Sequence, residues 1–169
     1  LEHEVEEAVR AMRQDRRERS TIVDLASRTF SEISERLYEK PGQLAISATD
    51  SGLRFLPQTP ADGSAGLMSM EVFCFDLTLA VLAQARGEGP GFIIHDSHLF
   101  EPVDGRQFAR ALQIAADFSA NTNIQYVALL NSDELVRAER ESGISFADYV
   151  LETELADTPY GGLFGIRFD

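Results

Sequence analysis

The feature that most constrains this chain is a nearly unbroken apolar run over residues 67–85. Such a run must be buried, and its length favours a buried helix over a strand. The small residues just before it, at 63–66, predict a loop that opens this helix. We judge no stretch long and apolar enough to span a bilayer, and we therefore expect no membrane partner.

A strand, a helix and a second strand follow this run. Residues 91–96 indicate a buried strand ending in an acid, residues 104–120 an amphipathic helix, and residues 124–130 a second apolar strand. This order predicts a right-handed crossover in a parallel sheet, and so an α/β fold. A helix over 132–141, capped by Ser132, and a closing hairpin over 149–155 and 163–168 complete the prediction.

The N-terminal region predicts one helix over residues 1–38. Leu1, Val5, Ala8 and Met12 have the spacing of a coiled-coil seam, with an ordinary amphipathic helix as the alternative. A wholly polar segment interrupts this seam, so we predict a coiled-coil stub at 1–20 and a globular domain at 21–169. Residues 44–49 and 53–56 flank a turn and predict a β-hairpin. The start in mid-helix, without Met, leads us to expect a piece of a longer protein.

Composition narrows the possible partners. The chain has 28 acidic and 15 basic residues, a formal charge of −13, so its surface as a whole should not attract nucleic acid or an anionic membrane. Contact with DNA would need a local patch such as the arginines of residues 10–19, which we interpret as a solvated helix face. The single cysteine, Cys74, excludes an intrachain disulfide and fits a cytoplasmic location.

Asp96 is the first candidate for chemistry, because it ends the first predicted strand. Ligand sites of open α/β sheets lie at the carboxyl ends of the strands. An acid at such an end holds magnesium in phosphate-binding proteins, as the Walker-B aspartate does. The alternative is an acid that caps the following turn.

Three further positions are candidates for a phosphate. The loop with Ser64, Ala65 and Gly66 opens a helix, whose N-terminus favours an anion; a flexible loop with a Ser cap is the alternative. Asn131 ends the second strand and, with strand ends adjacent, should lie near Asp96, where its amide could donate to a phosphate. Asp104 follows the first strand. Both Asn131 and Asp104 could instead act as helix or turn caps.

Taken in order, these features resemble the C-terminal lobe of SMC-type heads among the ABC-type ATPases, a P-loop NTPase-like fold. In that family a coiled-coil helix, a hairpin, a signature loop with its helix, a Walker-B strand, a D-loop, a helix and a switch strand follow one another. The resemblance covers residues 20–169. It looks closest to a bacterial SMC-like family with Phe-Asp-Leu after the signature and His-Asp-Ser at Walker B, here at 75–77 and 95–97.

The resemblance implies a role for each candidate. Ser64, Ala65 and Gly66 stand at the signature loop, which contacts the γ-phosphate held by an opposite head. Asp96 stands at the Walker-B aspartate near magnesium, Asp104 at the D-loop aspartate of the dimer interface, and Asn131 at the switch histidine. The implied function is an ATP-dimerised head, with ATP and Mg²⁺ as cofactors. It would couple nucleotide to coiled-coil movement in DNA repair, chromosome maintenance or mobile-element defence.

Two departures qualify this expectation. Ser97 stands where the family has a catalytic glutamate, and a serine cannot act as the same general base, so His98 or Glu101 would have to substitute. The sequence also contains no Gly-x-x-x-x-Gly-Lys loop, which in the family lies on an N-terminal lobe. We therefore expect this chain alone to be inactive. Its expected partners are that Walker-A lobe, a second head and DNA contacted through the complete protein.

Two other functions stay open. The first is a metal-dependent hydrolase that uses His95, Asp96, His98 and Asp104 as ligands. Against it, His95 and His98 should point in different directions if the strand continues through both. The second is a non-catalytic interaction module that kept the fold, an alternative that Ser97 keeps open.

Overall fold

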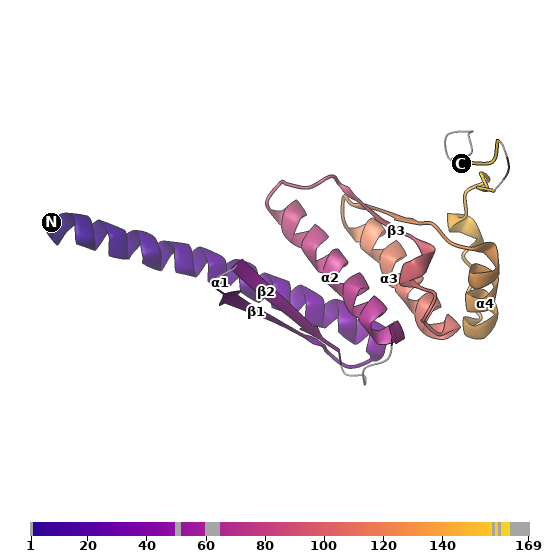
Figure 1. Ribbon diagram of the computed structural model, residues 1–169, viewed down its shortest axis with the longest axis horizontal. Coiled ribbons are helices and arrows are strands. Elements are labelled where there is room, and N and C mark those ends of the chain that lie inside the picture. The colour runs from indigo at the N-terminus through magenta and orange to yellow at the C-terminus, as the bar shows by residue number, and fades with distance from the viewer. Residues whose placement is uncertain (1, 50–51, 60–64, 157, 159, 163–169) are drawn as a thin grey trace.

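One long helix, α1 (Glu2–Tyr38), leads into the fold and confirms the helix predicted over residues 1–38. The computed structural model describes residues 2–49, 52–59, 65–156, 158 and 160–162, without the side chains of residues 2–19, 48, 49, 52, 53 and 65. The N-terminal part of α1 runs out past the rest of the molecule (Figure 1). The coiled-coil seam and its boundary at residue 20 depend on side chains outside this description, and they remain predictions.

The last turns of α1 pack on the body through a wide apolar stripe, as expected for a helix that covers a domain. Its fully or nearly buried members are Ala26, Phe30, Ile33 and Leu37. The hairpin follows at once: β1 (Gln43–Thr49) pairs antiparallel with β2 (Gly52–Gln58), as predicted. Hydrogen bonds that join this region to α1 run from the Gly42 N–H, just before β1, to Ser34 Oγ (2.7 Å) and from Ser27 Oγ to the Leu44 carbonyl (3.2 Å).

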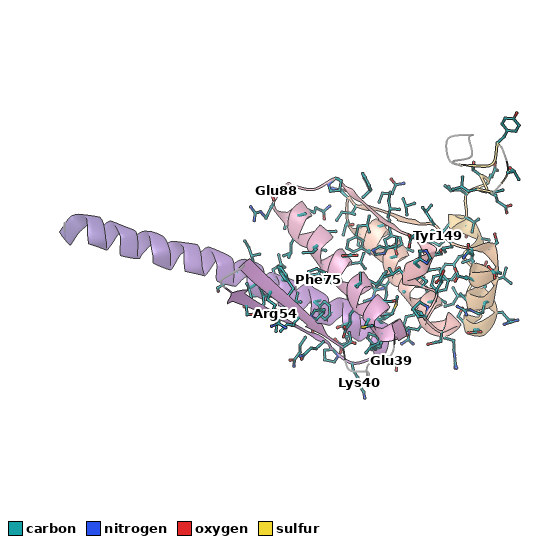
Figure 2. The ribbon with its side chains drawn as sticks, viewed as in Figure 1. Glu39, Lys40, Arg54, Phe75, Glu88 and Tyr149 are labelled. Atoms are coloured by element: carbon teal, nitrogen blue, oxygen red, sulfur yellow. The ribbon has the colours of Figure 1, made fainter. Side chains whose placement is uncertain are left out.

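The apolar run forms the helix α2 (Ala65–Ala85), which confirms the prediction that it is helical. It packs against α1, β2 and the first strand of the second sheet. Phe75 lies on the hairpin side, where its ring meets the edge of Phe55 at a centroid distance of 5.4 Å (Figure 2). The side chains that it buries in the core are Leu67, Met70, Phe73, Cys74, Leu77 and Thr78.

The expectation that no stretch could span a bilayer is wrong by the criteria of length and composition. Residues Gly66–Ala85 have a mean hydropathy of 1.7 and meet those criteria. The polar residues of this helix, such as Asp76 and Thr78, are too few to bring its mean hydropathy below that of a possible membrane span. In this fold the helix contributes to the core, and the same test is passed by core helices of globular proteins.

The second sheet confirms the parallel pairing. β3 (Phe92–His95) is followed by α3 (Gly105–Asn121) and then by β4 (Gln125–Ala128), which lies parallel to β3 in a register that ends at His95↔Ala128. Ile93 and His95 face the core made with α2 and α3, whereas Phe92 and Ile94 are exposed on the other face. Within the described residues each sheet has only two strands, so the chain is a mixed α/β fold with small sheets.

The C-terminal part departs from the prediction in two ways. In α4 (Ser132–Ser142) the cap position belongs to Asn131, and Ser132 is the first helical residue. After the short 3₁₀ helix η2 (Ala147–Tyr149), residues 150–156 form no strand, because no described segment lies beside them to pair with. A turn does close there, through the Ala156 N–H and the Gly161 carbonyl (2.8 Å). The other half of the predicted hairpin, 163–168, lies outside the described residues.

Candidate functional site

Asp96 leaves the sheet at the carboxyl end of β3, where it was predicted to be. Its backbone is extended, and its side chain accepts a hydrogen bond from the His98 N–H (3.1 Å), so that it caps the 3₁₀ helix η1 (Ser97–Leu99). The capping alternative is therefore real, although it uses one carboxylate oxygen, Oδ1. Asp96 is exposed. It can cap the turn and still face a ligand.

His98 and Glu101, the two candidate bases, form a pair. His98 Nδ1 is 3.1 Å from Glu101 Oε1, and the two side chains are 80% and 51% exposed. The pairing follows from local structure, because η1 and the turn after it place residues three apart on one side. A carboxylate beside an imidazole orients the ring, which is the arrangement used when a histidine takes up a proton.

Asp104 caps a helix through one of its carboxylate oxygens. Its Oδ1 accepts from the N–H groups of Arg106 and Gln107, each at 3.1 Å, at the start of α3. Asn131 has the same position at the start of α4, but its side chain makes no capping hydrogen bond in the part of the chain that the structure describes. The two candidates thus differ: Asp104 has a structural role, and the exposed amide of Asn131 has none of that kind.

Gly66 joins the start of α2 to the segment that follows β3. A side chain at this position would place its Cβ 2.4 Å from the carbonyl oxygen of Pro102. The first turn of α2 and the residues just before Asp104 are consequently in direct contact. Of the other two predicted loop residues, Ser64 lies outside the described residues, and Ala65 is described only as the first residue of α2.

These parts surround an open hollow of about 800 Å³ at the carboxyl edge of β3. Apolar side chains from α2, from β3 and from the segments just after β3 and β4 form most of its lining, and Asp96 and His98 supply the charged or titratable groups beside the buried His95. The lining residues are Met68, Ser69, Val72, Ile94, His95, Asp96, His98, Leu99, Pro102 and Leu129. The predicted residues Glu101, Asp104 and Asn131 lie outside this lining.

A comparison with protein families shows to which family this chain belongs. A family model described as "Uncharacterised protein conserved in bacteria (DUF2326)" matches residues 33–168, which is most of the chain. The chain belongs to the DUF2326 family. A search of curated proteins finds no match.

Two solved structures show a distant similarity to the DUF2326 chain. One is titled "Crystal structure of the SmcHead bound to the C-winged helix domain of ScpA", with a TM-score of 0.44 and 18% identity over 69% of this chain and 37% of that chain. The other is the SMC head domain from Thermotoga maritima, with a TM-score of 0.41 and 16% identity over 68% of this chain and 40% of that chain. The DUF2326 chain therefore spans less than half the length of either.

The structure does not support the hypothesis of a metal-dependent hydrolase. His95 is buried and has its two ring nitrogens next to Tyr126 and Asp76, whereas His98 is exposed, so the two histidines point in different directions as expected. No group of three or more His, Cys, Asp or Glu side chains that could hold a metal ion occurs among the described residues.

Sequence reasoning missed Asp76 and Tyr126 as members of this region. From the sequence, Asp76 is only a part of the Phe-Asp-Leu segment at 75–77, and Tyr126 is only a residue of the expected strand. One signal was present: His95 follows Ile93 by two residues, so in a strand both point toward the core. A buried histidine needs hydrogen-bond partners, but the sequence does not say which residues supply them.

Proposed function

We propose that this chain is the C-terminal half of an SMC-like, ABC-type ATPase head, and that it binds MgATP only after an N-terminal lobe covers its open face. One observation carries the proposal, the parallel β3–β4 pair. One face of this pair lies in the core, the other exposes Phe92 and Ile94, and its carboxyl end presents Asp96. Parallel sheets normally have both faces covered, so this pair calls for another layer.

The proposed layer is a lobe that carries the phosphate-binding loop. This chain contains no Gly-x-x-x-x-Gly-Lys segment, and such a loop supplies the lysine and the backbone N–H groups that hold the phosphates. A lobe seated on Phe92 and Ile94 would cover the open face of the sheet and bring its loop to the edge where Asp96 stands. The order of motifs, which resembles that of SMC-type heads, supports the same arrangement.

The exposed carboxylate of Asp96 suits magnesium, which prefers oxygen ligands and keeps part of its water shell. When bound, magnesium would neutralise charge on the phosphates of ATP. Asn131, with an amide free of capping, would donate to a phosphate from the neighbouring strand end. Ser64, Ala65 and Gly66 would meet the nucleotide of a second head, and Asp104 would hold α3 in place at the interface.

For hydrolysis we propose His98 as the base, oriented by Glu101. Ser97 offers no suitable proton acceptor, whereas the imidazole of His98 lines the same hollow as Asp96. The exposure of the pair implies slow turnover, because an exposed base gains little from an ordered, water-free environment. The lobe would have to cover it.

The test is nucleotide binding by this chain joined to its N-terminal lobe. Calorimetry should show MgATP binding that Asp96→Asn abolishes and that Glu152→Gln, a change at an exposed acid of the C-terminal segment, leaves intact. His98→Ala should lower turnover by about a hundredfold with binding unchanged. Absence of MgATP binding by the complete head, correctly folded, contradicts the proposal.

A second candidate is a head that binds ATP but does not hydrolyse it, and Ser97 is the observation in its favour. Binding without turnover in the same experiment would establish this ATP-switched interaction module. In either case we propose a cytoplasmic machine in DNA repair, chromosome maintenance or mobile-element defence, with any DNA contact made by the complete protein.

A further inference from the structure

His95 is the most thoroughly connected polar side chain of the sheet. It is the last residue of β3 and only 8% exposed. Its Nδ1 lies 2.8 Å from the hydroxyl of Tyr126 in β4, and its Nε2 lies 3.1 Å from Oδ2 of Asp76 in α2. One imidazole thus connects three elements that are distant in sequence.

The chemistry of the partners assigns the protons. A carboxylate oxygen is an acceptor, so the contact with Asp76 is satisfied when Nε2 of His95 carries a hydrogen and donates it. In a neutral imidazole Nδ1 is then the acceptor for the hydroxyl of Tyr126. Burial raises the pKa of Tyr126, and the charge of Asp76 raises it further, so the phenol keeps its proton. Each hydrogen in the set has an acceptor.

Aromatic rings hold the imidazole in place. The edge-to-face contacts of His95 have centroid distances of 5.4 Å to Tyr126 and 6.4 Å to Phe100, and Phe73 lies at 6.0 Å. Its main chain is also bound, because its carbonyl accepts from the Leu129 N–H at 2.9 Å. The peptide that leads from His95 into Asp96 is therefore restrained on both sides.

We propose that His95 is a positioning residue, which Asp76 and Tyr126 hold so that the end of β3 keeps the Asp96 carboxylate at the open edge of the sheet. The segments 75–77 and 95–97 are then joined by the hydrogen bond between Asp76 and His95 and act together. Because Asp76 belongs to α2, a shift of α2 would be transmitted to Asp96. The role toward magnesium rests on the proposed function, whereas the positioning itself concerns this chain alone.

The face of α2 that carries Asp76 also lines the hollow, so a lobe bound there could act on His95 through Asp76. Met68, Val72 and Asp76 follow one another at intervals of four residues and so lie on one face of the helix. Met68 and Val72 line the hollow together with Ile94, and the Asp76 side chain is 37% exposed. A lobe that settles over this face would press on the helix next to the carboxylate that holds His95.

Three variants separate the hydrogen bonds from simple packing. Asp76→Leu removes the acceptor, Asp76→Asn keeps an acceptor but removes the charge, and Tyr126→Phe removes one hydroxyl while keeping the ring. Tyr149→Phe, at the exposed last residue of η2, is the matched control for the last of these (Figure 2).

The first measurement is amide hydrogen exchange on this chain, and it needs no nucleotide. Asp76→Leu and Tyr126→Phe should speed exchange of the Leu129 N–H by about tenfold relative to that of Leu112 in α3, as expected when a buried hydrogen bond is lost. Asp76→Asn and Tyr149→Phe should leave this ratio unchanged. Exchange that rises equally at both amides in every variant overturns the proposal, since it would mean a general loss of stability. Nitrogen NMR of His95 should show the hydrogen on Nε2, and a hydrogen on Nδ1 alone would also overturn it.

The second measurement is the magnesium concentration for half-maximal ATP binding by the complete head. Asp76→Leu should raise it by about tenfold, and Asp76→Asn should restore it. If the complete head binds no MgATP, the proposed function fails while the exchange result stands. If the head binds normally and the Leu129 exchange ratio never changes, only the positioning role fails.

Discussion

Gly66 shows how a single atom determines the contact between two parts of the site. The Cβ of any other residue would stand 2.4 Å from the Pro102 carbonyl oxygen, and that neighbour is backbone, which cannot rotate away. The close packing of α2 against Pro102 is therefore enough to explain why a glycine stands at this position. The approach of a phosphate is therefore not needed to explain the glycine.

Replacing Gly66 with alanine should lower the free energy of unfolding by about 1–3 kcal/mol, because α2 or the loop at Pro102 must shift. This loss should exceed the gain of up to about 1 kcal/mol that alanine brings to a helix. Urea denaturation followed by circular dichroism measures it. Met68→Ala, at a side chain that is 63% exposed on the same helix, is the control. Equal stability of the two variants would show that the loop adapts without cost.

Cys74 is fully buried in α2, and its environment determines its reactivity. Burial raises the pKa of its thiol from 9.0 to about 12, and the nearby charge of Glu71 contributes to the shift. Because the thiolate is the reactive form, a thiol reagent at neutral pH should label the folded chain only as fast as it unfolds. Absorbance assays in native buffer and in denaturant check this, and rapid native labelling would mean that α2 is not packed as described.

The same shift predicts a dependence of stability on pH. Above pH 9.0 the unfolded chain releases the thiol proton, whereas the folded chain keeps it up to about pH 12. The contribution of Cys74 is therefore complete below pH 9.0 and is lost as the pH rises. Cys74→Ala, although less stable overall, should lose less stability than the parent chain over this range in parallel denaturation series.

At the scale of elements, the starts of α3 and α4 look alike in sequence but differ in structure. Asp104 accepts two backbone N–H groups and so satisfies two of the orphan donors of α3. Asn131 stands at the same position before α4 without using its side chain in this way. One candidate residue uses a carboxylate oxygen for capping, whereas the side chain of the other is not used in this way.

Alanine substitutions at the two positions should consequently have unequal effects. Asp104→Ala should lower the free energy of unfolding by about 0.5–2 kcal/mol, the usual cost of a lost cap. Asn131→Ala should change it by less than about 0.5 kcal/mol while weakening MgATP binding by the complete head. Denaturant titrations of both variants test the first statement, and a similar loss at Asn131 would show that it caps α4 in solution.

At the scale of the whole molecule, the main property is an apolar face that no described segment covers. Phe92 and Ile94 on β3, Leu129 after β4, and Met68 and Val72 on α2 are all exposed. The strands next to them also have unpaired edges within the described fold, and such edges can pair with another chain. The net charge of −13 opposes association, but it is spread over the molecule and does not cover this face.

We therefore expect the chain alone to associate as its concentration rises, and Ile94→Lys to suppress this. The substitution adds one positive charge to a chain of charge −13, so weaker association could not be caused by stronger net repulsion. Leu151→Lys, at a side chain that is 78% exposed on the C-terminal segment, carries the same charge change and should have little effect. Light scattering after size-exclusion chromatography measures the molar mass of the parent chain and of each variant and so tests this expectation. A parent chain that stays monomeric at high concentration would argue against an adhesive open face.

Much of this architecture follows from the sequence, because burial imposes a local repeat. The stripe of α1, the apolar length of α2 and the two short strands around α3 each identify an element from neighbouring residues alone. The end of β3 likewise predicts where Asp96 emerges, and the spacing of three residues brings His98 to Glu101.

The tertiary structure alone decided what depends on distant segments. Asp76 and Tyr126 lie 19 and 31 residues away from His95 in sequence, and only the packing of α2 and β4 on β3 selects them as its partners. Residues 150–156 form no strand, because a strand requires a neighbour that the described fold does not provide, and the other half of the expected hairpin, 163–168, lies outside the described residues. The sequence by itself determined the elements and the exposed acid at the edge of the sheet, since those depend on short-range periodicity. The partners of each polar group were decided by the tertiary structure, because a hydrogen bond depends on distance in space.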